Sequence, residues 1–160
     1  VLMCSNEIII KMDSDDIMFP DRIAKQIKFM ENNPEIHICG SQIKMFQDNI
    51  NKIVNITNLP TIQWNEFKQR PVHWFVNHPT VCYRRSSIIK AGNYNPELKK
   101  MAEDFNLELR MLKMFGAVYN FSEPLLYYRL HPGQITHKGG SEGRDYWNVV
   151  RNKMIKELLD

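Results

Sequence analysis

The sequence predicts an α/β domain, because short apolar runs typical of strands alternate with segments of helical period. Residues 8–12 form a short apolar run bounded by polar residues, as expected for a buried strand. Residues 20–32 carry Ile23 and Ile27 at helical spacing, and a proline follows shortly after this segment. Residues 103–115 repeat the helical period with buried-type side chains. These three segments favour a sheet flanked by helices.

The remaining elements follow in chain order. Residues 47–58 show no firm period and are interpreted as a variable hairpin or loop. Ser86 is the expected N-cap of a short helix that ends at Gly92. The last segment is expected to form a helix with an apolar stripe from Tyr146 to Leu158. The simplest explanation of this stripe is packing on the core, and contact with a membrane surface is the alternative. The expected strands share apolar character and turn-forming flanks: 36–39, 42–46, 80–83, 118–121 and 125–130.

An acidic cluster directly follows the first strand and contains Asp13, Ser14, Asp15 and Asp16. Open α/β sheets bind ligands at the carboxyl ends of their strands. Carboxylate oxygens suit Mg²⁺ or Mn²⁺ bound to a diphosphate, whereas a simple polar turn has the same composition. Arg22 lies close by in sequence and is expected to form a surface ion pair, with a ligand phosphate as the alternative.

A second acidic pair, Glu103 and Asp104, opens the helix that is expected to stop at Gly116. Acidic residues stabilise a helix N-terminus through its dipole, so capping alone accounts for their position. A carboxylate on such a rigid edge also serves as a general base when a substrate hydroxyl lies within about 3 Å. Both roles remain open from the pair alone.

Composition predicts a single intracellular domain. The chain has 160 residues, of which 43% are hydrophobic, and a net charge of +3. No apolar run approaches the roughly 20 residues that span a bilayer. The cysteines Cys4, Cys39 and Cys82 are few and scattered, which favours reduced thiols over disulfides or a zinc site. We expect a cytoplasmic location and no nucleic-acid partner, since no basic stripe or nucleic-acid motif is present.

The chain resembles the inverting family 2 glycosyltransferases, which have the GT-A fold. The similarity spans nearly all 160 residues, and the matching segments run in the family's order. They are Ile8 to Asp16, Pro20-Asp21-Arg22, Asn33-Pro34-Glu35, His78-Pro79-Thr80-Val81, Gly92-Asn93-Tyr94, Glu103-Asp104 and Tyr128-Arg129-Leu130-His131. The resemblance implies transfer of a sugar from a nucleotide-diphosphate donor to an acceptor hydroxyl, with inversion at the anomeric carbon. The acceptor class, whether glycan, lipid or protein, is left open.

One departure from the family is large. Family members begin with a nucleotide-binding half, whereas here the acidic cluster arrives within two dozen residues of Val1. We therefore expect residues 1–160 to be a partial, truncated GT-A domain with a mixed sheet flanked by helices. It would contain the portion of the domain that binds the metal, the diphosphate and the acceptor. Such a fragment is expected to expose the edge of its first strand and to self-associate.

The resemblance also implies roles for the donor side of the site. Asp15 would hold Mn²⁺ or Mg²⁺ across the two phosphates, with support from Asp13 and Asp16. His131 is expected to contact the metal or the diphosphate. Residues 134–141, which include paired glycines, are expected to form a mobile loop that closes over the donor.

On the acceptor side, the resemblance implies that Asp104 removes the proton from the attacking hydroxyl and that Glu103 orients Asp104 or touches the acceptor. Two alternatives remain. A catalytically inactive GT-A-like fragment would act as a binding or interaction module. A metal-dependent phosphohydrolase would need a Thr or Val shortly after its second acid, which the Asp16-Ile17-Met18 sequence does not provide.

Overall fold

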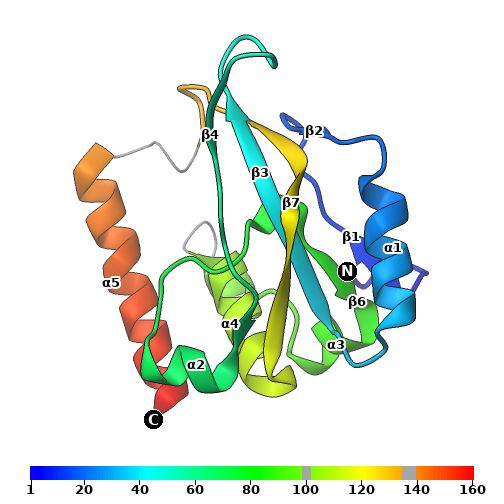
Figure 1. The fold of residues 1–160 in the computed structure, drawn as a ribbon. Coiled ribbons are helices and arrows are strands. Elements are labelled where there is room, and N and C mark those ends of the chain that lie inside the picture. The colour runs from blue at the N-terminus through cyan, green and yellow to red at the C-terminus, as the bar shows by residue number, and fades with distance from the viewer. Residues whose placement is uncertain (99–101, 135–139) are drawn as a thin grey trace.

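A seven-stranded mixed sheet forms the centre of the protein (Figure 1). The computed structural model describes residues 1–98, 102–134 and 140–160. The main strand order is β1-β6-β3-β7-β2, while β4 pairs with β3 and β5 pairs with β7. The strands are β1 (Ile8–Ile10), β2 (Ile17–Met18), β3 (Ile38–Phe46), β4 (Ile53–Ile56), β5 (Ile62–Gln63), β6 (Cys82–Arg84) and β7 (Ala117–Arg129). The parallel pair β3 and β7 is the long central ladder, and the other pairings are antiparallel.

Helices cover both faces of this sheet, with α1 on one side and α4 and α5 on the other (Figure 1). They are α1 (Arg22–Asn32), α2 (Trp64–Gln69), α3 (Arg85–Lys90), α4 (Glu103–Phe115) and α5 (Gly140–Leu159), with 3₁₀ turns η1 (His78–Thr80) and η2 (Pro96–Leu98). Neighbouring strand residues alternate between the faces: Ile38 packs with α4 and Cys39 with α1. The predicted α/β class is confirmed.

Helix α4 forms as its sequence predicts. Phe105, Leu109 and Leu112 are buried on one face, in agreement with the helical period. Gly116 follows the last turn with φ of +87°, a left-handed conformation that glycine adopts without a side-chain clash. The helix therefore starts at the predicted acidic pair and holds Glu103 and Asp104 at a fixed edge.

The predicted breaks in the two central strands are wrong. Gly40 and Ser41 continue β3, because Gly40 leaves room for the side chain of Val76 and the Ser41 amide donates to Thr80 Oγ1 at 2.9 Å. The expected strands at 118–121 and 125–130 are likewise one strand, β7, whose register against β3 shifts near Pro124. The pairing of β3 with β7 becomes irregular next to these turn-forming residues, so each strand continues past them.

Two other expectations also need correction. Ser86 is not the N-cap of α3, since the helix begins at Arg85 and the Ser86 amide and hydroxyl both donate to the Glu7 carboxylate. In α5, Met154 is buried as expected, but Tyr146 is 53% exposed. Within the described residues, no helix is long and apolar enough to cross a membrane. The loop predicted at 134–141 lies largely outside the described residues.

Candidate active site

The acidic cluster lies in the loop between β1 and β2, where it meets the end of β7. Asp16 is buried, and its Oδ1 accepts a hydrogen bond from the Arg129 amide at 3.0 Å. The other oxygen, Oδ2, has no hydrogen-bond partner within the described part of the chain. Burial raises the pKa of Asp16 to about 6, although the Arg129 amide acts in the opposite direction. Asp16 therefore fixes the loop onto β7.

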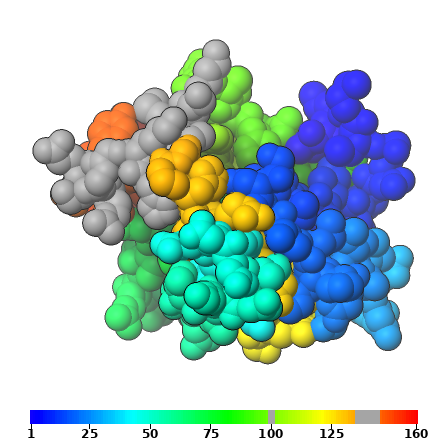
Figure 2. Space-filling model, turned by 90° about the horizontal axis from the view of Figure 1, so that it is seen from above, coloured from blue at the N-terminus to red at the C-terminus, as the bar shows by residue number. Residues whose placement is uncertain are grey.

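Asp15 and His131 come together across the same junction. The distance between Asp15 Oδ2 and His131 Nε2 is 2.9 Å, and Arg129 Nε donates to the Asp15 carbonyl at 3.0 Å. The hydrogen bond from His131 lowers the pKa of Asp15. Both side chains are about 39% exposed and can be reached by a ligand. A cavity of about 430 Å³ adjoins His131, and Figure 2 shows this part of the chain lying between the β3–β4 hairpin and the acidic loop.

Asp13 takes a different partner from Asp15. Its Oδ1 lies 2.5 Å from Lys11 Nζ, and its side chain is 44% exposed. No group of three or more His, Cys, Asp or Glu side chains with metal-binding geometry occurs among the residues the structure describes. Two carboxylates alone still suit Mg²⁺ or Mn²⁺, because such ions are commonly held by one or two carboxylates together with substrate phosphates. Asp13 and Asp15 are the carboxylates that would hold such an ion, which stays a prediction.

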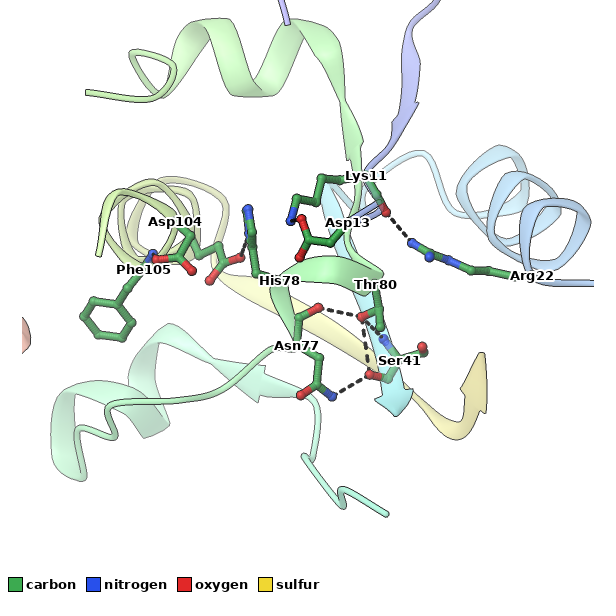
Figure 3. A network of polar contacts seen from close by, with 10 residues as sticks. Lys11, Asp13, Arg22, Ser41, Asn77, His78, Thr80, Asp104 and Phe105 are labelled. Carbon is green, nitrogen blue, oxygen red and sulfur yellow. Dashed lines mark hydrogen bonds and ion pairs between the residues drawn. The ribbon is translucent and has the colours of Figure 1, made fainter. Parts of the chain in front are cut away.

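Arg22 is buried beneath the acidic loop and donates a hydrogen bond to the Lys11 carbonyl just before it. Its predicted position in a surface ion pair is therefore wrong. Its side chain is fully buried, and Nη2 donates to the Lys11 carbonyl at 2.6 Å while Nε donates to Gln26 Oε1 at 3.0 Å. Gln26 in turn donates to the Thr80 carbonyl at 2.7 Å. Figure 3 shows Arg22 reaching Lys11 from α1. Helix α1 therefore buries Arg22 and Gln26, while Ile23 is 44% exposed.

The second acidic pair lines a cavity of about 490 Å³. Asp104 Oδ1 accepts a hydrogen bond from the Phe105 amide at 2.7 Å, which fixes the carboxylate at the start of α4. The side chain of Lys11, ion-paired with Asp13, approaches from the opposite wall (Figure 3). The cavity is lined by Lys11, His78, Tyr94, Asn95, Pro96, Glu103 and Asp104. The fold thus brings Lys11, which precedes the acidic loop, and the second acidic pair, about 90 residues later in sequence, to one cavity.

Sequence reasoning missed a buried pair, His78 and Glu108, of which His78 lines this cavity. His78 Nδ1 lies 2.7 Å from Glu108 Oε1, and their side chains are 17% and 5% exposed. Burial raises the pKa of Glu108 to about 6, against the effect of His78. Burial alone would lower the pKa of His78, but the hydrogen bond and charge of Glu108 raise it overall. The available signal was Glu108 itself, an acidic residue one turn after Asp104 on the buried face of α4.

The fold and its paired acidic segments define a GT-A type α/β domain. The S. aureus TarS 1-349 structure in complex with UDP-GlcNAc has the same fold, with a TM-score of 0.62 and 16% identity over 99% of this chain and 49% of that chain. Residues 1–92 match the family model described as glycosyl transferase family 2. The chain belongs to this family, as its motifs predict.

Two curated relatives extend the comparison over nearly the whole chain. An uncharacterized glycosyltransferase of Haemophilus influenzae is 32% identical over 154 residues, which cover 96% of this chain and 56% of the relative. The amylovoran biosynthesis glycosyltransferase AmsE of Erwinia amylovora is 27% identical over 151 residues, covering 94% and 53%. The chain spans about half the length of the curated relatives it matches.

Proposed function

We propose that the protein contributes to a glycosyltransferase reaction in which a sugar passes from a nucleotide-diphosphate donor to an acceptor hydroxyl, with inversion. One observation carries the proposal: Asp104 and Lys11, which is ion-paired with Asp13, line a single cavity. A displacement of this kind needs a base on one side of the reacting carbon and charge neutralisation on the other. Its relatives are named as glycosyltransferases, which supports the same class of reaction.

The donor would bind beside the acidic loop. Asp15 and Asp13 would hold Mn²⁺ or Mg²⁺, which, when bound, neutralises charge on the departing diphosphate. Asp16 keeps the loop in place through the Arg129 amide, and Lys11 adds a positive charge at the cavity wall. The UDP-GlcNAc named in the TarS structure makes UDP-sugars the first donors to test.

The acceptor hydroxyl would bind on the α4 side. Asp104 would accept its proton, since the carboxylate lines the cavity and its backbone hydrogen bond fixes its orientation. Glu103 lines the same wall and would contact the acceptor or orient Asp104.

Calorimetry with UDP-GlcNAc, with Mn²⁺ or with a chelator, tests the donor side. We expect Mn²⁺ to strengthen nucleotide binding, because metal and diphosphate each fill coordination positions that the other leaves open. Equal affinity in both conditions would contradict metal-assisted donor binding. UDP release on addition of an acceptor tests transfer, and metal-dependent binding without any turnover would instead support the binding-module alternative.

A further inference from the structure

The buried His78–Glu108 pair has no role in the proposed reaction, although His78 lines the cavity of about 490 Å³ beside Asp104 (the central cavity). His78 comes from the 3₁₀ turn η1, and Glu108 comes from α4, one helical turn after Asp104. The 2.7 Å contact between His78 Nδ1 and Glu108 Oε1 uses one of the two ring nitrogens. The ring also packs edge-on against Tyr94, with centroids 6.0 Å apart and an interplanar angle of 81°. Its orientation is therefore set from two sides.

The backbone around His78 is equally constrained. Asn77 Nδ2 donates to the Ser41 carbonyl at 2.8 Å, and Thr80 Oγ1 donates to the Asn77 carbonyl at 2.7 Å. These bonds tie η1 to the central strand β3, as Figure 3 shows. A side chain held this firmly loses little conformational entropy when it binds a ligand, which favours a binding role.

The second ring nitrogen, Nε2, remains available to the cavity. It forms no hydrogen bond with any residue that the structure describes, and it points away from Glu108 because the two ring nitrogens lie on different edges of the imidazole. In Figure 3 the ring stands between Asp104 on one side and the Lys11–Asp13 pair on the other. In the proposed reaction, this is the space between the acceptor and the diphosphate, where the transferred sugar must lie.

We propose that His78 Nε2 forms a hydrogen bond with a hydroxyl group of the transferred sugar and that Glu108 is the residue that positions its ring. This inference rests on the proposed function and adds a contact that distinguishes one donor sugar from another. A sugar hydroxyl both donates and accepts, so it matches an imidazole nitrogen in either protonation state. A buried polar contact of this type discriminates strongly against a sugar that lacks the hydroxyl or presents it in another direction.

The substitution His78→Asn separates binding from structure. The asparagine amide nitrogen falls close to the position of Nδ1 and can still donate to Glu108, while nothing occupies the position of Nε2. We expect unchanged affinity for UDP and a 3- to 10-fold loss of affinity for UDP-GlcNAc or UDP-galactose, about the effect of one neutral hydrogen bond. His78→Gln carries an amide at the position of Nε2 and should recover part of the loss.

His73→Asn is the matched control. His73 is a partly exposed histidine whose Nε2 contacts Asn152 Oδ1 at 2.7 Å, outside the cavity. Affinities for UDP and for both UDP-sugars are measured by calorimetry in the presence of Mn²⁺, and thermal unfolding shows that each variant folds. The control should match the wild-type protein with all three ligands.

The outcomes separate this inference from the function on which it rests. Wild-type protein that binds neither UDP nor a UDP-sugar contradicts the proposed function, and the inference fails with it. Normal wild-type binding, together with a folded His78→Asn variant that loses UDP and UDP-sugar affinity equally or loses neither, overturns the inference alone. A selective loss for the UDP-sugar supports it.

Discussion

His131 Nε2 lies 2.9 Å from Asp15 Oδ2, although 116 residues separate them in sequence. The Gly133 amide donates to the other ring nitrogen, Nδ1, at 3.2 Å. Because Nδ1 accepts this bond, the neutral imidazole carries its proton on Nε2 and donates it to Asp15. A metal on Nε2 would displace that proton. The arrangement therefore favours His131 as a hydrogen-bond donor to Asp15 or to a phosphate, and its role as a metal ligand stays a prediction.

Removal of the Asp15 carboxylate should weaken metal binding. We expect Asp15→Asn to lower Mn²⁺ affinity in the presence of UDP by at least about tenfold, because a neutral amide is a poorer ligand than a carboxylate. Electron paramagnetic resonance of free Mn²⁺ measures the change. Glu31→Gln, an exposed position on α1 with the same loss of charge, is the control, and an equal effect from both variants would point to general electrostatics.

Replacement of the proposed base should abolish transfer without loss of donor binding. The amide oxygen introduced by Asp104→Asn can still accept from the Phe105 amide, so the start of α4 should remain intact. General-base removal typically lowers turnover about 10²–10⁴-fold. Turnover is followed by UDP release in the presence of acceptor, with Glu97→Gln as an exposed acidic control. Turnover of the Asp104→Asn variant close to that of the wild-type protein would show that Asp104 only caps the helix.

Local signals in the sequence predicted the parts of the fold that depend on neighbouring residues. Helix α4 is one case, since its apolar period and the Gly116 stop lie within the segment itself. The acidic loop after β1 is another. The burial of Arg22 was not predictable in this way, because its acceptors are the Lys11 carbonyl and Gln26, and a basic residue beside acids normally suggests the surface.

The candidate site shows the same division. Asp15, Asp104 and His131 were named from motifs, and the structure brings Asp15 to His131 and Asp104 into the central cavity. The His78–Glu108 pair joins residues 30 positions apart on different elements. The place of Glu108 on the buried face of α4 indicates a buried carboxylate, but no local pattern identifies His78 as its partner. Long-range pairs of this kind emerge only from the packing of α4 on the sheet.

Loss of the buried Arg22 side chain should destabilise the protein. Arg22→Met would leave the Lys11 carbonyl and Gln26 Oε1 without their donor, at a cost of about 1–3 kcal/mol per unsatisfied group. Each 1 kcal/mol lowers the melting temperature by about 2–4 °C in a domain of this size. Arg22→Lys should not rescue stability, since an ammonium group cannot reproduce the fork of donors. Lys28→Met, exposed on the same helix, should have little effect in thermal unfolding, and equal losses at both positions would contradict this account.

The His78–Glu108 pair should make stability depend on pH. Folding raises the pKa of Glu108 from 4.5 to about 6 and also raises the pKa of His78. The folded state therefore binds more protons than the unfolded state. The contribution of this pair to the free energy of unfolding thus falls as the pH rises through about 6 and beyond. Lys11 and Asp104 also act on the pair through their charges.

Glu108→Gln should reduce this decline, because the amide carries no titratable charge and its oxygen can still accept from His78 Nδ1. Melting temperatures at pH 5 and pH 8 measure the effect, with Glu31→Gln as the control. We expect the difference between the two pH values to be smaller in the variant than in the wild-type protein. The same difference in both proteins would show that the pair does not couple folding to protons.

The outer edge of β1 predicts self-association. Among the residues that the structure describes, β1 pairs only with β6, and its three isoleucines are partly exposed. Unpaired strand edges readily pair with other chains. Light scattering should give an average mass above the 19.0 kDa of a single chain as the concentration rises. A mass that stays at 19.0 kDa across the range would contradict the prediction.

The parallel ladder between β3 and β7 has a consequence for the order of events during synthesis. It pairs Cys39 with Tyr119 and Phe46 with Arg129, so β3 leaves the ribosome about 80 residues before its central partner. At about 5–20 residues per second, this interval lasts roughly 4–16 s. Asp15 and Asp16 emerge even earlier and gain Arg129 and His131 only once β7 has docked. The acidic loop therefore cannot adopt its ligand-ready arrangement on a nascent chain until β7 and His131 have left the ribosome.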